Sequence, residues 1–133
     1  MKSKKIKYSV EFNFPQTATN ILWSNISTPR GLENWFADSV QNQDNEWTFT
    51  WDKTTQKAHC VSNRANTLIK FRWNNDSKDH YFEFKLFENE LVHITTLIIT
   101  DFANEDEIEN DKQLWETQIN YLKHNLGIKK KKK

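Results

Sequence analysis

The sequence predicts an α+β fold in which a curved antiparallel sheet of about six or seven strands wraps around a long C-terminal helix, with two short helices after the first strand. Apolar and polar residues alternate along an N-terminal segment and along several segments between residues 37 and 100, which is typical of half-buried strands. One amphipathic stretch of about 20 residues follows them, and no other predicted element is long enough to cover a face of such a sheet.

The N-terminal region contains the first strand and both short helices. Alternation over residues 6–14 predicts the strand, and Pro15 ends it because proline has no N–H for the ladder. Apolar residues at helical spacing predict a short helix over residues 16–25. A second helix is expected to begin at Pro29, which suits a first helical position, with Thr28 as its cap. The residues it is expected to bury are Leu32, Trp35 and Phe36.

The middle of the chain is predicted to be a meander of strands. Alternating patterns predict strands over residues 47–51, 69–73 and 82–86. Residues 91–100 are apolar on both sides of the alternation, as expected of a strand that is covered on both faces. Short polar clusters, which favour turns and therefore antiparallel neighbours, occupy residues 42–45, 52–55, 63–66, 74–79 and 88–90.

The last element is predicted to be the long helix. Asn104 can cap it, and Glu107 three residues later completes a capping box. Acidic residues over 105–111 suit the positive end of the helix dipole. Gly127 is placed to end the helix in a left-handed turn. Its apolar stripe consists of Ile108, Trp115, Ile119, Leu122 and Leu126.

Length and charge limit the class of protein. With 133 residues, the chain is expected to form a single domain over residues 1–128, followed by a disordered lysine tail at 129–133. Nine lysines lie at the two ends, which leaves the body of the chain with ten basic and 18 acidic residues. Because the body is acidic, we expect no nucleic-acid partner. The competing interpretation of the tail is a weak tether to anionic lipid or nucleic acid.

Cysteine usage and hydropathy describe the expected compartment. One cysteine, Cys60, cannot form an internal disulfide or supply a cysteine-based zinc site. No apolar run approaches the roughly 18 residues of a membrane span, and the N-terminus lacks the apolar stretch of a signal peptide. We therefore expect a cytoplasmic protein, monomeric and without stable membrane insertion.

The element order carries a family resemblance. The segment ISTPRGLENWFA at residues 26–37, together with the closing helix around Leu114 and Trp115, resembles the START-like helix-grip (SRPBCC) superfamily. The chain is most similar to the branch named for the activator of the heat-shock-protein ATPase and to small bacterial START-like proteins. The resemblance covers residues 5–127, and its most specific part is the pattern of Thr28, Pro29, Leu32 and Trp35. It implies the fold and leaves the activity open, because relatives bind lipids, hormones or polyketides, cyclise polyketides, or assist a chaperone.

No catalytic or metal motif is recognisable. His59 and Cys60 resemble a base and a nucleophile, but neighbouring residues on a strand point to opposite faces. The acids at 105–111 lack the ligand spacing and central glycine of a calcium loop, and a helix start explains them. No dinucleotide, phosphate-loop or nucleophile-elbow motif occurs. We therefore expect no enzyme activity, cofactor or metal.

Function is predicted from the aromatic residues, which number six Trp, nine Phe and three Tyr. Rigid aromatic side chains can form the core between sheet and helix or the wall of a chamber. We expect non-enzymatic binding of a hydrophobic small molecule or lipid there. The alternatives are a chaperone-associated interaction module and a polyketide-cyclase-like enzyme. The residues expected to line the space are Leu32, Trp35, Phe49, Trp51, Phe71, Trp73, Phe84, Leu97, Trp115 and Ile119, with His93 and Thr95 as polar contacts.

Overall fold

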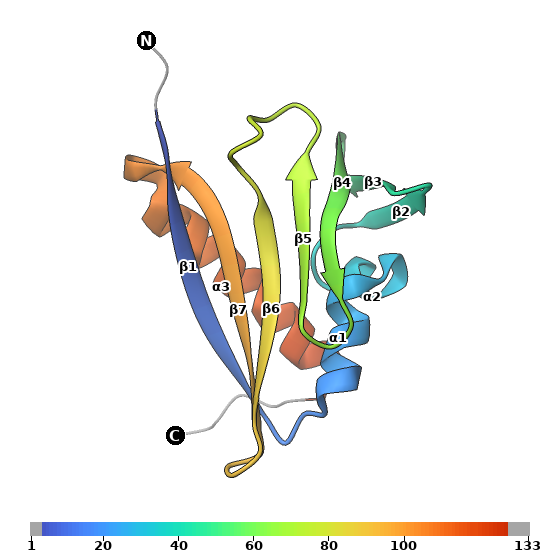
Figure 1. Ribbon diagram of the computed structural model, residues 1–133, viewed down its shortest axis with the longest axis vertical. Helices are drawn as coiled ribbons and strands as arrows, with labels where there is room; N and C mark the ends of the chain where they lie inside the picture. The colour runs from blue at the N-terminus through green and yellow to red at the C-terminus, as the bar shows by residue number, and fades with distance from the viewer. Residues whose placement is uncertain (1–3, 128–133) are drawn as a thin grey trace.

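Seven antiparallel strands form one sheet in the computed structural model, which describes residues 4–127 (Figure 1). The sheet order is β1-β7-β6-β5-β4-β3-β2, so the first and last strands are neighbours and the remaining strands follow as a meander. The predicted fold class is confirmed. The predicted lysine tail at 129–133 lies outside the described residues. The strands are β1 (Lys5–Pro15), β2 (Ser39–Gln43), β3 (Glu46–Trp51), β4 (Thr54–Arg64), β5 (Leu68–Trp73), β6 (Phe82–Asn89) and β7 (Ile94–Asn104).

The helices pack on one face of this sheet. They are α1 (Thr19–Ser27), α2 (Pro29–Glu33) and α3 (Ile108–Asn125), and a short 3-10 turn, η1 (Glu105–Glu107), precedes α3. In Figure 1, α3 runs diagonally behind β1, β7 and β6, and its C-terminal end lies near α1 and α2. The side chain of Asn125 donates a hydrogen bond to the backbone carbonyl of Asn34, which joins α3 to the segment after α2.

The core lies between α3 and the concave face of the sheet. Trp115 and Leu122 of α3 are buried, and Trp115 contacts Phe84 of β6 edge to face at 5.8 Å between ring centroids. The strands supply large side chains at alternate positions, as the sequence pattern predicts. Those that are fully buried include Phe14, Phe49, Phe71, Phe82, Phe84, Ile69, Leu97 and Ile99.

Thr28 and Gly31 determine how the two short helices meet. The Thr28 hydroxyl accepts a hydrogen bond of 3.0 Å from the Gly31 amide, and Pro29 is the first helical residue, so the predicted cap is confirmed. A Cβ atom at Gly31 would lie 2.1 Å from the carbonyl oxygen of Ser24 in α1. Glycine is therefore required for α2 to approach α1 this closely.

The long helix begins later than the sequence predicts. Residues 105–107 form the turn η1, and Asn104 makes no cap to a backbone amide. Its side-chain nitrogen instead donates to the Glu107 carboxylate at 3.2 Å, so the predicted capping box is wrong. The C-terminal prediction is confirmed. Gly127 has a φ of 81° and donates its amide to the carbonyl of His124, as a left-handed helix end requires.

Two other boundaries differ from the prediction. Residues 91–93 form the turn between β6 and β7, so the strand predicted from residue 91 begins at Ile94. The first helix begins at Thr19 because Gln16 adopts a φ of 57°, which a helix does not allow. The β2–β3 turn is also tighter than predicted. It needs only Asp44 and Asn45, both with positive φ, as in a two-residue hairpin turn.

Candidate ligand-binding site

A cavity of about 390 Å³ opens between α3 and the concave face of the sheet. It lies at the end of the fold where β7 leads through η1 into α3, and the N-terminal half of α3 forms one side of it. Its volume is within the range of small-molecule sites in proteins. The residues that line it are Phe36, Trp51, Trp73, Asp101, Asp111, Leu114, Trp115, Thr117 and Gln118.

Four aromatic rings form the apolar wall of this cavity. Phe36, in the segment between α2 and β2, stacks on Trp115 with centroids 5.7 Å apart and planes 10° apart. The edge of the Trp51 ring meets Phe36 at 5.4 Å, and Trp73 lies 6.2 Å from Trp51. Trp51 and Trp73 are only partly buried. The wall therefore offers indole surface to an occupant at the open end.

Hydrogen bonds hold this wall in place. The Trp51 indole N–H donates to the backbone carbonyl of Phe36 at 2.6 Å. The side-chain amide of Gln118 on α3 donates to the same oxygen at 3.0 Å. One carbonyl thus ties β3 and α3 to the segment that carries Phe36, and the aromatic surfaces are fixed before any ligand arrives.

Another part of the cavity lining is polar. Asp101 projects from β7 and Asp111 from α3, and Tyr8 of β1 adjoins both. The Trp115 indole N–H donates to the Tyr8 hydroxyl at 3.1 Å, and Asp111 is close enough to Tyr8 for each to affect the pKa of the other. The Asp101 carboxylate accepts the backbone N–H of Phe102 at 2.8 Å. These residues, from three elements, lie close enough to perturb one another's pKa values and form one polar cluster.

Burial perturbs the ionisation of this cluster. Loss of solvation, with a smaller contribution from the negative charge of Asp111, raises the pKa of Asp101 to about 6 against the opposing effect of the Phe102 N–H. Burial and the charge of Glu107 raise the pKa of Asp111. Burial and the Asp101 charge also raise the pKa of Tyr8, so its hydroxyl stays protonated.

The negative charge of the cluster is not matched locally. Within residues 4–127, neither Asp101 nor Asp111 has a basic side chain within salt-bridge distance. Lys5 is close enough to lower the pKa of both carboxyls, but its Nζ pairs with Asp76 at 3.2 Å. The cavity therefore has an excess of negative charge at its polar side.

The structure brings ten of the predicted lining residues to the space between sheet and helix. Trp51, Trp73 and Trp115 line the cavity. The other seven are buried in the packed core, so side chains fill most of the expected chamber and leave it open at one end. Those seven are Leu32, Trp35, Phe49, Phe71, Phe84, Leu97 and Ile119.

The predicted placement of His93 is wrong, and Thr95 lies elsewhere in the fold. His93 is exposed in the β6–β7 turn with a φ of 56°. Thr95 is buried, but its hydroxyl donates to the Thr17 carbonyl at 2.9 Å. His93 directly precedes β7 and Thr95 lies at its beginning, whereas Asp101 lies near its end. The strand starts three residues later than predicted, which removes His93 from the inward-facing row.

Sequence reasoning missed the polar half of the site. The helix dipole accounts for the acids at the helix start, but it does not predict that Asp111 faces the cavity. The sequence contains one signal of the polar half: Asp101 is a carboxylate directly after a segment predicted to be a strand with two apolar faces. The lining residues absent from the prediction are Phe36, Asp101, Asp111, Leu114, Thr117 and Gln118.

The His59 and Cys60 pair is not arranged for catalysis. His59 Nδ1 lies 3.1 Å from the side-chain oxygen of Asn74, and the Cys60 thiol donates to the Ser62 carbonyl. Burial raises the pKa of Cys60, which disfavours the reactive thiolate. Over residues 4–127, no three His, Cys, Asp or Glu side chains are grouped to hold a metal ion.

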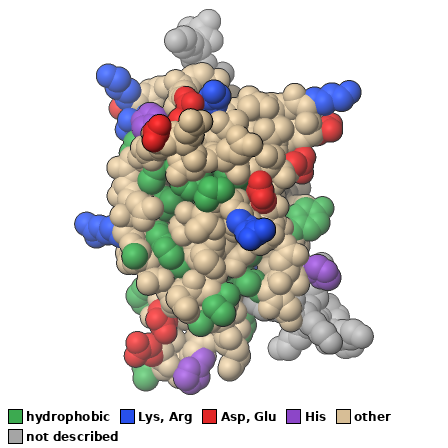
Figure 2. Space-filling view, turned by 90° about the vertical axis from the view of Figure 1, so that its right-hand side faces the viewer, with side chains coloured by type: hydrophobic (Ala, Val, Ile, Leu, Met, Phe, Trp, Pro, Cys, Tyr) green, Lys and Arg blue, Asp and Glu red, His purple; other side chains and the backbone are tan. Residues whose placement is uncertain are grey.

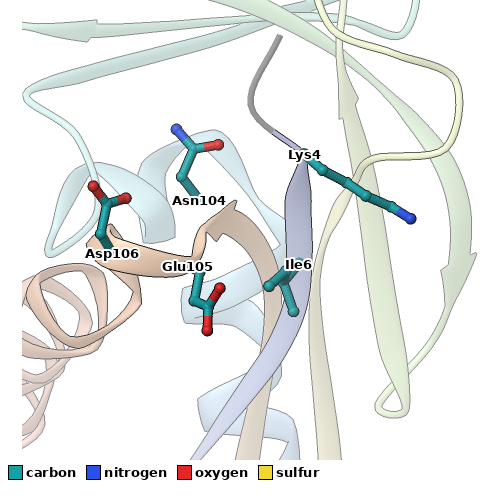
Figure 3. Close-up of a pocket in the computed structure, with 5 residues that line it drawn as sticks. All are labelled: Lys4, Ile6, Asn104, Glu105 and Asp106. Atoms are coloured by element: carbon teal, nitrogen blue, oxygen red, sulfur yellow. The ribbon is translucent and has the colours of Figure 1, made fainter. Parts of the chain in front are cut away.

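A larger cavity, of about 560 Å³, lies where the start of β1 meets the end of β7 (Figure 3). Lys4, Ile6, Glu105 and Asp106 are exposed there, and only Asn104 is partly buried. The Lys4 side chain points away from the other four in Figure 3. The groups do not converge on a ligand, so this depression is a weaker candidate than the aromatic cavity.

The charged side chains on one face of the described residues do not form a patch. On the face in Figure 2, Lys and Arg side chains are scattered among acidic and hydrophobic ones and form no continuous basic patch. None of the described helices is long and apolar enough to cross a membrane.

Comparisons with solved structures agree on the fold. The chain is 41% identical to protein BfR322 of Bacteroides fragilis, solved by NMR, with a TM-score of 0.68 and coverage of 98% of this chain and 97% of that one. Protein MLL2253 of Mesorhizobium loti has a TM-score of 0.75 at 14% identity, with coverage of 95% and 100%. The Aha1 dimer of Colwellia psychrerythraea has a TM-score of 0.69 at 13% identity, with coverage of 90% and 93%.

The family comparison agrees with the sequence resemblance. No functionally curated protein matches the chain. The family described as the START-like superfamily domain matches residues 2–128, which is nearly the whole sequence. Together with the seven-stranded sheet, the C-terminal helix and the 41% identical relative, this match identifies the chain as a member of the START-like superfamily.

Proposed function

We propose that the protein binds a hydrophobic small molecule or lipid, without catalysis, in the cavity between α3 and the sheet. The observation that carries the proposal is the cavity of about 390 Å³ whose wall consists of Phe36, Trp51, Trp73 and Trp115. Burial of apolar ligand surface would supply the driving force, at about 25 cal/mol per Å² before ordering costs. The pre-formed wall keeps those ordering costs low.

Native mass spectrometry of the purified protein tests this proposal. We expect a mass above that of the bare chain. The excess should equal the mass of a molecule that organic extraction releases from the protein. A protein that carries no such molecule and also binds none from a lipid extract would contradict the proposal.

A pair of substitutions on α3 tests where the molecule binds. Thr117 lines the cavity at its rim, so Thr117→Phe would fill it without removing a core side chain. Asn120 is exposed on the same helix and lines none of the cavities described above, so Asn120→Phe is the matched control. We expect Thr117→Phe to abolish the bound mass and Asn120→Phe to retain it. Loss in both variants or in neither would place the ligand elsewhere.

A polyketide-cyclase-like reaction is the second candidate. It needs at least two polar groups that converge on the ligand, and Asp101 and Asp111 both line the cavity. A carboxyl with a pKa of about 6 is suited to proton transfer near neutral pH. Incubation of the extracted molecule with the protein would distinguish the two. Conversion to a product that Asp101→Asn prevents would favour the cyclase, and an unchanged molecule would favour binding alone.

A chaperone-associated role is supported only by the likeness to Aha1, which at 13% identity concerns the fold and not the partner. Such a role would be independent of the cavity. Recovery of a chaperone by the wild type and by Thr117→Phe alike would favour it over ligand binding.

A further inference from the structure

Most of the hydrogen-bond donors around the aromatic cavity are used within the protein, whereas its two carboxylates offer acceptors. The indole N–H groups of Trp51 and Trp115 donate within the protein, to the Phe36 carbonyl and the Tyr8 hydroxyl. The Gln118 amide donates to that same carbonyl, and the Thr117 hydroxyl donates to the carbonyl of Gln113. The acidic side chains, in contrast, are acceptors when ionised. A ligand that fits this site must itself supply donors or positive charge.

Charge leads to the same conclusion. Asp101 and Asp111 both line the cavity, and each raises the energy of an additional negative charge there. The basic side chain that influences them, Lys5, is engaged with Asp76 at 3.2 Å. A carboxylate or phosphate ligand would be repelled from this side of the cavity, whereas a cation would relieve the repulsion between the two aspartates.

The aromatic wall also suits a cation. The face of an indole ring carries partial negative charge and attracts a positive centre that lies within about 6 Å of it. Trp51 and Trp73 are partly exposed at the cavity, with centroids 6.2 Å apart, and Trp115 closes the inner side. Indole rings next to paired carboxylates form the kind of site that recognises an organic ammonium group.

We propose that the ligand is a hydrophobic organic cation, an alkylammonium or quaternary ammonium compound, whose positive centre lies between the carboxylates of Asp101 and Asp111 and the indole faces, and whose apolar part covers the rest of the aromatic wall. The proposal rests on ligand binding in this cavity and adds the chemical class of the ligand. It distinguishes this site from one for fatty acids or phospholipid headgroups with net negative charge. The two carboxylates of the cavity provide too few oxygen ligands for a bare metal ion.

Binding should then depend on pH. The groups that face Asp101 are Asp111 from α3 and Lys5 and Tyr8 from β1, and Glu107 of η1 acts on Asp111. Below about pH 6, Asp101 gains a proton and its attraction for a cation is lost. Affinity for a cationic ligand should therefore fall between about pH 8 and pH 5, whereas affinity for a neutral ligand of the same shape should not.

Three probes that have alkyl chains of similar length but differ in charge test the proposal by calorimetry: octyltrimethylammonium, 1-octanol and octanoate. We expect the cation to bind at least about tenfold more tightly than the other two. Asp101→Asn should reduce this preference about tenfold. Asp111→Asn is the second variant, and Asp44→Asn, in the exposed β2–β3 turn, is the control for overall charge.

The outcomes separate this inference from the function on which it rests. If octanol binds and Thr117→Phe prevents it, but the cation has no advantage, the cavity binds ligands and the cationic class is wrong. Equal or tighter binding of octanoate would also overturn the class. If none of the three probes binds in a way that Thr117→Phe prevents, the proposed function itself fails.

Discussion

Substitution of Asp101 by asparagine is expected to stabilise the protein at neutral pH. Burial and the charge of Asp111 raise the pKa of Asp101 to about 6, from the model-compound value of 3.8. In the unfolded chain the carboxyl ionises at the lower pH, so between these two values the folded protein binds more protons. The free energy of unfolding therefore falls as the pH rises through this window, and above about pH 6 the loss is complete.

The size of the effect follows from the shift. One pKa unit corresponds to about 1.36 kcal/mol, so a shift of roughly two units sets an upper limit of about 3 kcal/mol. Water at the open end of the cavity screens part of it, and we expect a gain of about 1 to 3 kcal/mol for Asp101→Asn at about pH 7.5. Asparagine keeps an oxygen for the Phe102 amide and removes the charge that Asp111 repels.

Urea denaturation at about pH 7.5 and about pH 3.5 measures this gain. We expect Asp101→Asn to be more stable than wild type at the higher pH and equal to it at the lower pH, where the wild-type carboxyl is protonated. Asp44→Asn should leave the difference between the two pH values unchanged. Equal stability of wild type and Asp101→Asn at both values, or a loss at the higher one, would refute the reasoning.

The other predictions concern packing and hydrogen bonding, and urea denaturation followed by circular dichroism measures each. Gly31→Ala should destabilise by about 3 kcal/mol or more, because its Cβ would lie 2.1 Å from the Ser24 carbonyl oxygen. Gly127→Ala, with open space but a φ of 81°, should cost only about 1 kcal/mol, and equal costs would contradict this account. Tyr8→Phe should cost about 1 to 3 kcal/mol because the buried Trp115 N–H loses its acceptor, and a cost near zero would mean that water replaces it.

Most of the fold could be predicted because its signals are local. Alternation in β1 and β3, the Thr28–Pro29 helix start and the glycine at 127 each act within a few residues. The boundaries that were wrong depend on contacts between distant segments. The amide of Gln16 donates to the His93 carbonyl at 2.8 Å, which ties the start of the first helix to the β6–β7 turn. Sequence spacing carries no information about such a contact.

The candidate site was predictable only in its apolar half. Period-two alternation places Trp51 and Trp73 on the inward face, and helical spacing does the same for Trp115. The polar half depends on where β7 ends relative to the first turns of α3, which brings Asp101 and Asp111 into one cavity. A shift of a few residues, as at His93, is enough to move a side chain into or out of the site.

The concentration of indole rings at this cavity has a spectroscopic consequence. Trp51 and Trp73 lie 6.2 Å apart, close enough to transfer excitation energy between them, and Trp115 lines the same space. Three of the six tryptophans of the protein therefore lie beside the cavity. An occupant that quenches or shields either partly exposed indole will change the emission of the group, so a fluorimeter can follow occupancy without an added label.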